Sequence, residues 1–194
     1  MHKVLSFYYN LILENKQWLK AITTLFFIAV LGGVGVGLIY SGLIEYIANI
    51  FADKFGANPN LDLNLALQIF IQNLVAALIA SFGGIILSII PILTVSTNGF
   101  LIGYIITIII KMDEKIPDVL LTVLPHAIIE LPVIIFAAAL GAKLGVNWLQ
   151  KNPKRPDLQV LQTDILNIVY STPLMAILLL IAALIEVFIS GSFT

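Results

Sequence analysis

Long apolar runs separated by short polar stretches dominate the pattern along this chain. No Asp, Glu, Lys or Arg occurs between Leu63 and Ile110. A spanning helix needs about 20 predominantly apolar residues, so this stretch alone can cross a bilayer twice. The pattern predicts an all-α fold, a polytopic integral membrane helix bundle that forms a single membrane domain over residues 1–194.

The apolar runs predict about five transmembrane helices, and the third of them is short for a full crossing. Their expected ranges are about 18–44, 65–88, 95–110, 119–141 and 168–189. Residues 1–17 are mixed in character, with apolar side chains at helical spacing, which is typical of an interfacial helix lying on the membrane. The lipid bilayer is therefore the first expected partner.

Prolines inside apolar runs predict broken helices around Pro91–Asn98 and Pro125–Pro132. The helix-break residues are Pro91, Gly99, Pro125 and Pro132. Proline has no N–H donor, so each proline within a helix leaves a carbonyl one turn earlier without its partner. In lipid such a carbonyl is tolerated only where protein or a wet cavity satisfies it. The second break is therefore expected to face the protein interior.

Composition and charge narrow the class further. The chain is 60% hydrophobic and 11% charged, against about 25% charged residues in soluble domains. The net charge of −1 gives no reason to expect a nucleic-acid partner, and the absence of Cys excludes disulfides and thiolate chemistry. Most of the ten Lys and Arg residues fall on one side of the predicted spans. The positive-inside rule then predicts a multi-pass plasma-membrane protein with a cytoplasmic N-terminus and an external C-terminus.

The segment LPHAIIELP places His126 and Glu130 one helical turn apart near the centre of the fourth predicted span. A charged residue at mid-helix costs about 2.5–3.5 kcal/mol on insertion scales, so Glu130 needs a partner. Asn73 and Asn98 offer both donor and acceptor groups and are the expected partners. These four residues form either a binding site for a proton, cation or solute, or a set of packing hydrogen bonds between helices.

Catalysis is not expected, and neither is a metal or a cofactor. The other histidine, His2, is at the terminus, so a zinc site of the HExxH type cannot be assembled. No second acid is expected beside Glu130, because Glu186 is expected to reach toward the membrane interface. Three GxxxG pairs predict close helix contacts and a homo-oligomer through glycine-rich faces. They are Gly33/Gly37, Gly99/Gly103 and Gly141/Gly145.

These residues, in this order, resemble the stage II sporulation protein M family. The resemblance rests on Asn73, Pro91, Asn98-Gly99, LPHAIIELP and Gly141 with Gly145. It implies a five- or six-span membrane protein without established catalytic residues. In spore formers the family works with proteins that remodel peptidoglycan. Two functions stay open: a non-enzymatic channel-like or transporter-like protein, or the membrane scaffold subunit of a complex with other membrane proteins.

Overall fold

The computed structural model describes residues 2–43, 46, 61–111, 116–149 and 158–189. Within these ranges the side chains of residues 2–5, 109, 116–127 and 149 are outside the description. The described parts are helical and contain no strand, which confirms the all-α prediction.

Six α-helices and one short 3-10 helix make up the described parts. They are α1 (His2–Glu14), α2 (Lys16–Ile39), α4 (Leu63–Phe82), η1 (Gly83–Ile85), α5 (Ile89–Lys111), α6 (Ile116–Leu149) and α7 (Leu158–Phe188). Five of these helices, α2 and α4 to α7, are long and apolar enough to cross a membrane. The chain is therefore a multi-pass membrane protein, as its sequence predicts.

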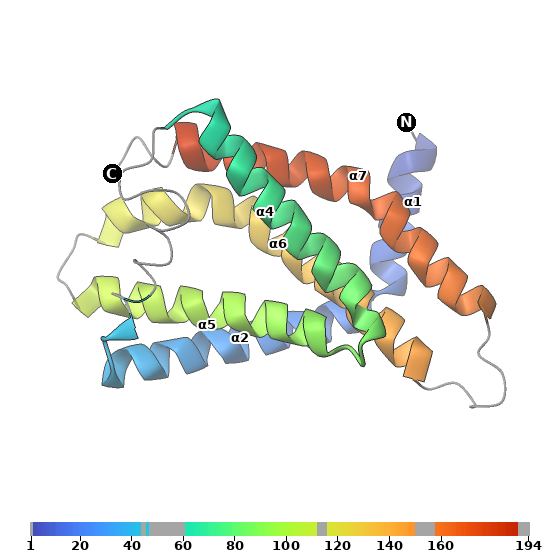
Figure 1. The fold of residues 1–194 in the computed structure, drawn as a ribbon, viewed down its shortest axis with the longest axis horizontal. Helices are drawn as coiled ribbons and strands as arrows, with labels where there is room; N and C mark the ends of the chain where they lie inside the picture. Colours follow the sequence, from blue (N-terminus) through green and yellow to red (C-terminus); the bar gives the residue numbers. More distant parts are fainter. Residues whose placement is uncertain (1, 44–45, 47–60, 112–115, 150–157, 190–194) are drawn as a thin grey trace.

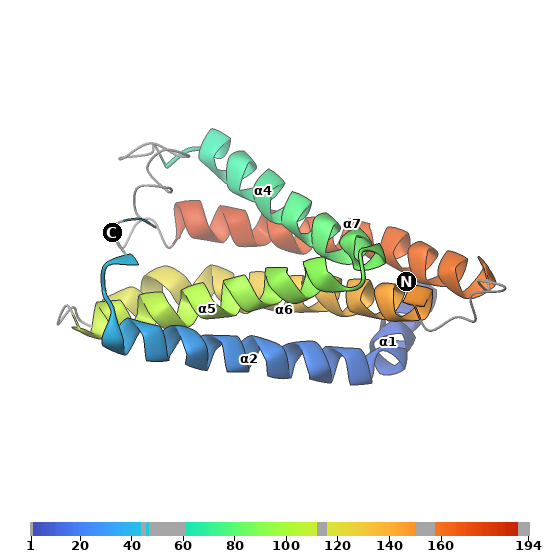
Figure 2. The ribbon, with the colours of Figure 1, turned by 60° about the horizontal axis from the view of Figure 1, so that its bottom comes forward.

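Helix α6 lies at the centre of the bundle and contacts α2, α4, α5 and α7. The long helices alternate in direction, so α2, α5 and α7 run one way while α4 and α6 run the other way (Figure 1). Helices α2 and α5 lie side by side along most of their length in both views (Figures 1 and 2). Helix α4 packs mainly on α6 and α7 and makes few contacts with α5.

Glycines bring α2 and α5 together until their backbones touch. A Cβ atom on Gly33 would collide with the carbonyl oxygen of Phe100, and one on Gly103 would collide with that of Val30. The glycines of this contact are Gly33, Gly37, Gly99 and Gly103. Two of the three predicted GxxxG pairs therefore pack within the chain, where small residues allow close approach.

The third GxxxG pair packs against the turn between α4 and α5. Gly141 and Gly145 of α6 lie against Gly84 of η1, with no room for a Cβ on any of the three. All three glycine pairs are thus occupied by intrachain contacts. A homo-oligomer stays a prediction, and a second copy would need another surface.

The first predicted break, around Pro91–Asn98, is wrong in position. Helix α5 begins at Ile89 and continues through Pro91, Asn98 and Gly99. Pro91 lies in the first turn, where the missing N–H would have no partner within the helix. The chain breaks earlier, after the glycines of η1, where Leu87 and Ser88 adopt positive φ angles of 54° and 59°.

The second predicted break, around Pro125–Pro132, is absent because α6 is continuous from Ile116 to Leu149. A proline removes one helical hydrogen bond, but ending a helix in apolar surroundings would leave many more backbone groups unpaired. The helix therefore continues through both prolines, as α7 continues through Pro173.

Helix α1 turns steeply away from α2 at Asn15 (Figures 1 and 2). The amide Nδ2 of Asn15 donates to the carbonyl oxygen of Leu11 at 2.7 Å. Leu11 packs against Leu140, Leu144 and Ile168, so α1 is attached to α6 and α7. Because α1 crosses the direction of the bundle, its orientation fits the predicted interfacial helix, whose position on a membrane stays a prediction.

Candidate functional site

Asn73 of α4 and Glu130 of α6 meet inside the bundle. Both side chains are half-buried, and the Asn73 amide donates a hydrogen bond to the Glu130 carboxylate. Asn73 lies in phase with Ile69, Ala77 and Ala80, the buried face that α4 turns toward its neighbours. Glu130 lies near the middle of α6. The structure therefore places one of the two expected asparagine partners beside the acid.

A second acid, Glu186 of α7, lies close enough to Glu130 for the two carboxylates to interact electrostatically. The expectation that no other acid is found near Glu130 is therefore wrong. Glu186 follows Leu179, Ala182 and Ala183 at helical spacing, and all three are buried. Residues at i, i+3, i+4 and i+7 share one helix face, so this phase was the sequence signal that placed Glu186 inward.

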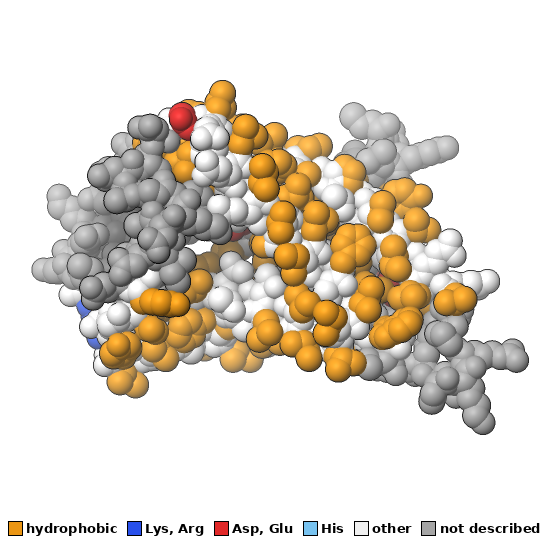
Figure 3. Space-filling view, in the orientation of Figure 1, with side chains coloured by type: hydrophobic (Ala, Val, Ile, Leu, Met, Phe, Trp, Pro, Cys, Tyr) orange, Lys and Arg blue, Asp and Glu red, His pale blue; other side chains and the backbone are white. Residues whose placement is uncertain are grey.

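The surface between α4 and α5 is hollowed, and acidic atoms are visible deep in the hollow (Figure 3). Helix α4 diverges from α5 toward its first residues, which is clearest in Figure 2. Asn73, Glu130 and Glu186 come from three helices, so we call them the three-helix acidic site.

Other predicted residues lie elsewhere or outside the description. The Asn98 amide donates to the carbonyl oxygen of Thr94 in its own helix at 2.8 Å, and no contact with Glu130 is found for it among the described residues. Gly99 packs on α2. The backbone of His126 is part of α6, but its side chain and that of Pro125 lie outside the described residues.

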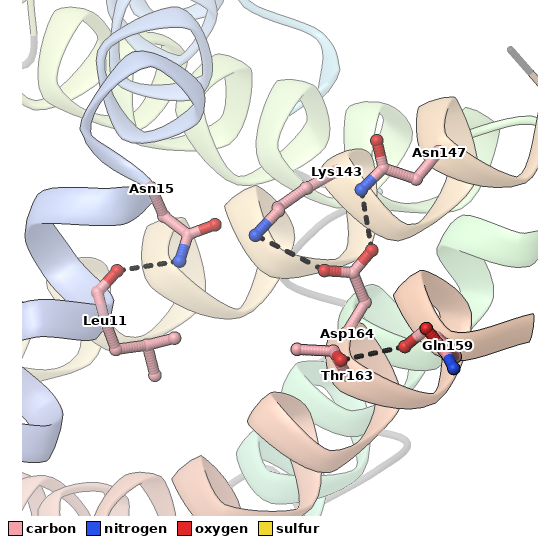
Figure 4. Close-up of polar contacts among 7 residues, drawn as sticks. All are labelled: Leu11, Asn15, Lys143, Asn147, Gln159, Thr163 and Asp164. Carbon is pink, nitrogen blue, oxygen red and sulfur yellow. Dashed lines mark hydrogen bonds and ion pairs between the residues drawn. The ribbon is translucent and has the colours of Figure 1, made fainter. Parts of the chain in front are cut away.

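A second polar cluster, which we call the junction cluster, lies where the α1–α2 corner meets α6 and α7. Asp164 of α7 is 4% exposed. It forms an ion pair with Lys143 of α6 at 3.3 Å and accepts a hydrogen bond from Nδ2 of Asn147 at 2.7 Å. Asn15 completes the cluster (Figure 4). Sequence reasoning missed it because Lys143, Asn147 and Asp164 lie between the fourth and fifth predicted spans, which were expected at about 119–141 and 168–189.

An apolar layer separates the two polar groups along α6. Ala137, Ala138 and Ala139 are completely buried and pack in one core cluster with Ala77 and Ala80 of α4. The hydroxyl group of Ser81 is bonded to the carbonyl oxygens of Ala77 and Ala137, at 2.9 and 3.3 Å. The layer is apolar among the described residues and lies between the three-helix acidic site and the end of the bundle that carries α1.

The chemistry available at the three-helix acidic site is that of two carboxylates and one amide. Carboxylates that lie close together cannot both carry a full charge at low cost, so a shared proton or a bound cation stabilises them. Among the described residues no group of three or more His, Cys, Asp or Glu side chains suits a metal ion. Carboxylate and amide oxygens are the ligands that hard cations prefer, so this donor set suits a proton or a small hard cation.

Comparison with known proteins identifies one family. The family model described as stage II sporulation protein M matches residues 21–191. None of the curated proteins and none of the solved structures compared with the chain matches it.

Proposed function

The chain belongs to the stage II sporulation protein M family, and from this premise we propose that it moves protons or another small cation across the membrane. One observation carries the proposal, the grouping of Asn73, Glu130 and Glu186 from three helices inside the bundle. Acidic residues within spanning helices are costly, and they mark ion pathways and proton relays in membrane proteins.

The apolar layer favours a transporter-like mechanism over a permanently open pore. Ala137, Ala138 and Ala139 place a buried apolar layer between Glu130 and the junction cluster. A cation bound at Glu130 would reach the other side only after α4 and α6 shift relative to each other. Movement of one set of helices against another around a fixed site is the usual mechanism of secondary transporters.

A scaffold role is the alternative, as the membrane subunit of a complex like those that remodel peptidoglycan in spore-forming relatives. Its support comes from family membership and from the outer face of α2. On that face Phe27, Ile28 and Leu31 are exposed and available for contact with lipid or with a partner helix. Catalysis and cofactors form no part of either proposal.

Flux measurements on purified protein in liposomes test the transport proposal. Glu130→Gln and Glu186→Gln keep the size of the side chain and remove the charge, so each should lower proton or cation flux about tenfold or more. His126→Ala is expected to lower it as well. Glu14→Gln makes the same change at an exposed acid of α1 and should leave flux unchanged.

The outcomes separate the two functions. If wild-type liposomes conduct no proton, Na⁺, K⁺ or divalent cation, the transport proposal fails and the scaffold role is favoured. A Glu14→Gln variant that loses as much flux as Glu130→Gln would show that the acidic site is not special. Stable partner proteins that co-purify from native membranes would support the scaffold role.

A further inference from the structure

The junction cluster is the second place where buried polar groups of distant segments meet. Its four members, Asn15, Lys143, Asn147 and Asp164, come from the α1–α2 corner, α6 and α7 (Figure 4). We propose that this cluster is a latch that holds α1 against the bundle, and that Asn15 is the residue that closes it. The proposal does not depend on transport.

Asn15 carries the first part of the argument. It is completely buried, and its Nδ2 group donates to Leu11, but its Oδ1 atom has no hydrogen-bond partner. In Figure 4 this oxygen is turned toward the ammonium group of Lys143. A buried acceptor without a donor is costly, so the nearest donor that faces it should pair with it.

Lys143 carries the second part. Its ammonium group has three donors, and its ion pair with Asp164 needs only some of them. The ammonium lies between the Asp164 carboxylate and the Asn15 oxygen (Figure 4). The Lys143 ammonium group therefore supplies a positive charge next to both the Asp164 carboxylate and the Asn15 oxygen. The chemistry is that of a tie between helices.

Apolar side chains and a hydrogen bond of Tyr8 also join α1 to the bundle among the described residues. Leu11 packs on Leu144 and Ile168, and the Tyr8 hydroxyl donates to the carbonyl oxygen of Tyr170 at 2.9 Å. Apolar contacts are not directional, so they allow α1 to slide, whereas the proposed pairing of the Asn15 oxygen with the Lys143 ammonium would fix its position. Because Asp164 also holds Asn147, a movement of α1 would be transmitted to both α6 and α7.

Thiol labelling in lipid nanodiscs tests the latch, because the chain has no cysteine of its own. Leu11 is 2% exposed, so a Leu11→Cys variant should react slowly with a soluble maleimide. Adding Asn15→Ala should speed the reaction about tenfold or more, since it removes the oxygen that we propose to pair with the Lys143 ammonium. Adding Asn15→Asp, which keeps an oxygen facing Lys143, should not. Asn147→Ala is the matched control, because it removes a bond to Asp164 without changing α1.

Three results would overturn the latch. Unchanged labelling in Asn15→Ala would mean that apolar packing alone holds α1. Equal acceleration in Asn15→Asp would place the effect in the lost bond to Leu11, and equal acceleration in Asn147→Ala would indicate general loosening.

A second measurement avoids the packing change at Leu11. The rings of Phe7 and Tyr170 are in edge-to-face contact, with their centroids 6.0 Å apart, so a Phe7→Cys/Tyr170→Cys pair should be joined by a covalent bond through a short bifunctional maleimide while α1 is docked. Asn15→Ala should slow that bond and Asn147→Ala should not. An unchanged rate in Asn15→Ala would again count against the latch.

Discussion

Several hydroxyl and amide side chains of the described helices are satisfied by their own helix. The hydroxyl groups of Ser81, Thr94, Thr107 and Ser171 each donate to the carbonyl oxygen four residues earlier, and the Asn98 amide does the same. Such local bonds let polar residues sit in apolar surroundings without a partner on another helix. Polar groups with a different arrangement are therefore informative, and they include the three-helix acidic site, the junction cluster and Tyr104.

Tyr104 of α5 is completely buried, and its hydroxyl group has no hydrogen-bond partner among the described residues. An unsatisfied buried polar group costs about 1–3 kcal/mol, so Tyr104→Phe should raise the stability of the protein by about that amount. Thermal unfolding in detergent, followed by loss of the monodisperse peak in size-exclusion chromatography, measures the change. A lower unfolding temperature would show instead that the hydroxyl group has a partner, such as a buried water molecule.

The three-helix acidic site could be predicted only in part from the sequence. The difficulty was to decide which face of each helix is turned toward the interior of the bundle. Asn73 was expected near Glu130 because its amide offers both a donor and an acceptor. Glu186 was assigned to the membrane interface from its distance to the end of the span, although Ala182 and Ala183 place it on the inner face. Asn98 shows the opposite error, since an amide can be satisfied by its own helix. The face of the helix on which a residue lies predicted its partners better than its position along the helix did.

The hydrophobic pattern predicted the number and the type of the spanning helices, but it did not predict the residues at which they begin and end. Helix α7 begins at Leu158 and not near Ile168, because Asp164 is paired with Lys143 inside the bundle. A polar stretch normally indicates a loop, and only the three-dimensional partner shows that it continues a helix. The predictions of broken helices were wrong for a related reason. In apolar surroundings the need for backbone hydrogen bonds outweighs the tendency of proline to break a helix.

The close contact of α2 and α5 gives a prediction with a control at the neighbouring residue. In Gly33→Ala the new Cβ would collide with the backbone of Phe100, whereas in Gly32→Ala it would meet nothing within 4 Å. Overpacking costs about 1–3 kcal/mol or more, while alanine in place of an exposed helix glycine gains up to about 1 kcal/mol. Gly33→Ala should therefore lower the unfolding temperature, and Gly32→Ala should leave it unchanged or raise it. Equal loss of stability in both variants would argue against the α2–α5 contact.

The whole molecule combines two polar sites with one apolar layer between them. The three-helix acidic site lies near the middle of α6, and the junction cluster lies at the end that carries α1. Ala137, Ala138 and Ala139 fill the interval. If the protein transports, the layer must open while the glycine contacts of α2 and α5 stay closed. Helices α4 and α6 are then the pair that moves. Their interface would therefore contribute both to transport and to the stability of the bundle.

Orientation in the membrane belongs to the same scale. Lys16, Lys20 and Lys143 lie at the end of the bundle that carries α1, and Lys111 lies at the far end, where its Nζ donates to the carbonyl oxygen of Leu38 at 2.7 Å. The side with more lysine is expected to be cytoplasmic. Single cysteines test this in a chain that has none of its own, at Gln17 and Ser41, which are both exposed and flank α2. A membrane-impermeant maleimide should label Ser41→Cys in intact cells, and Gln17→Cys only after the membrane is opened. The reverse pattern would invert the orientation, and labelling of both in intact cells would contradict a crossing by α2.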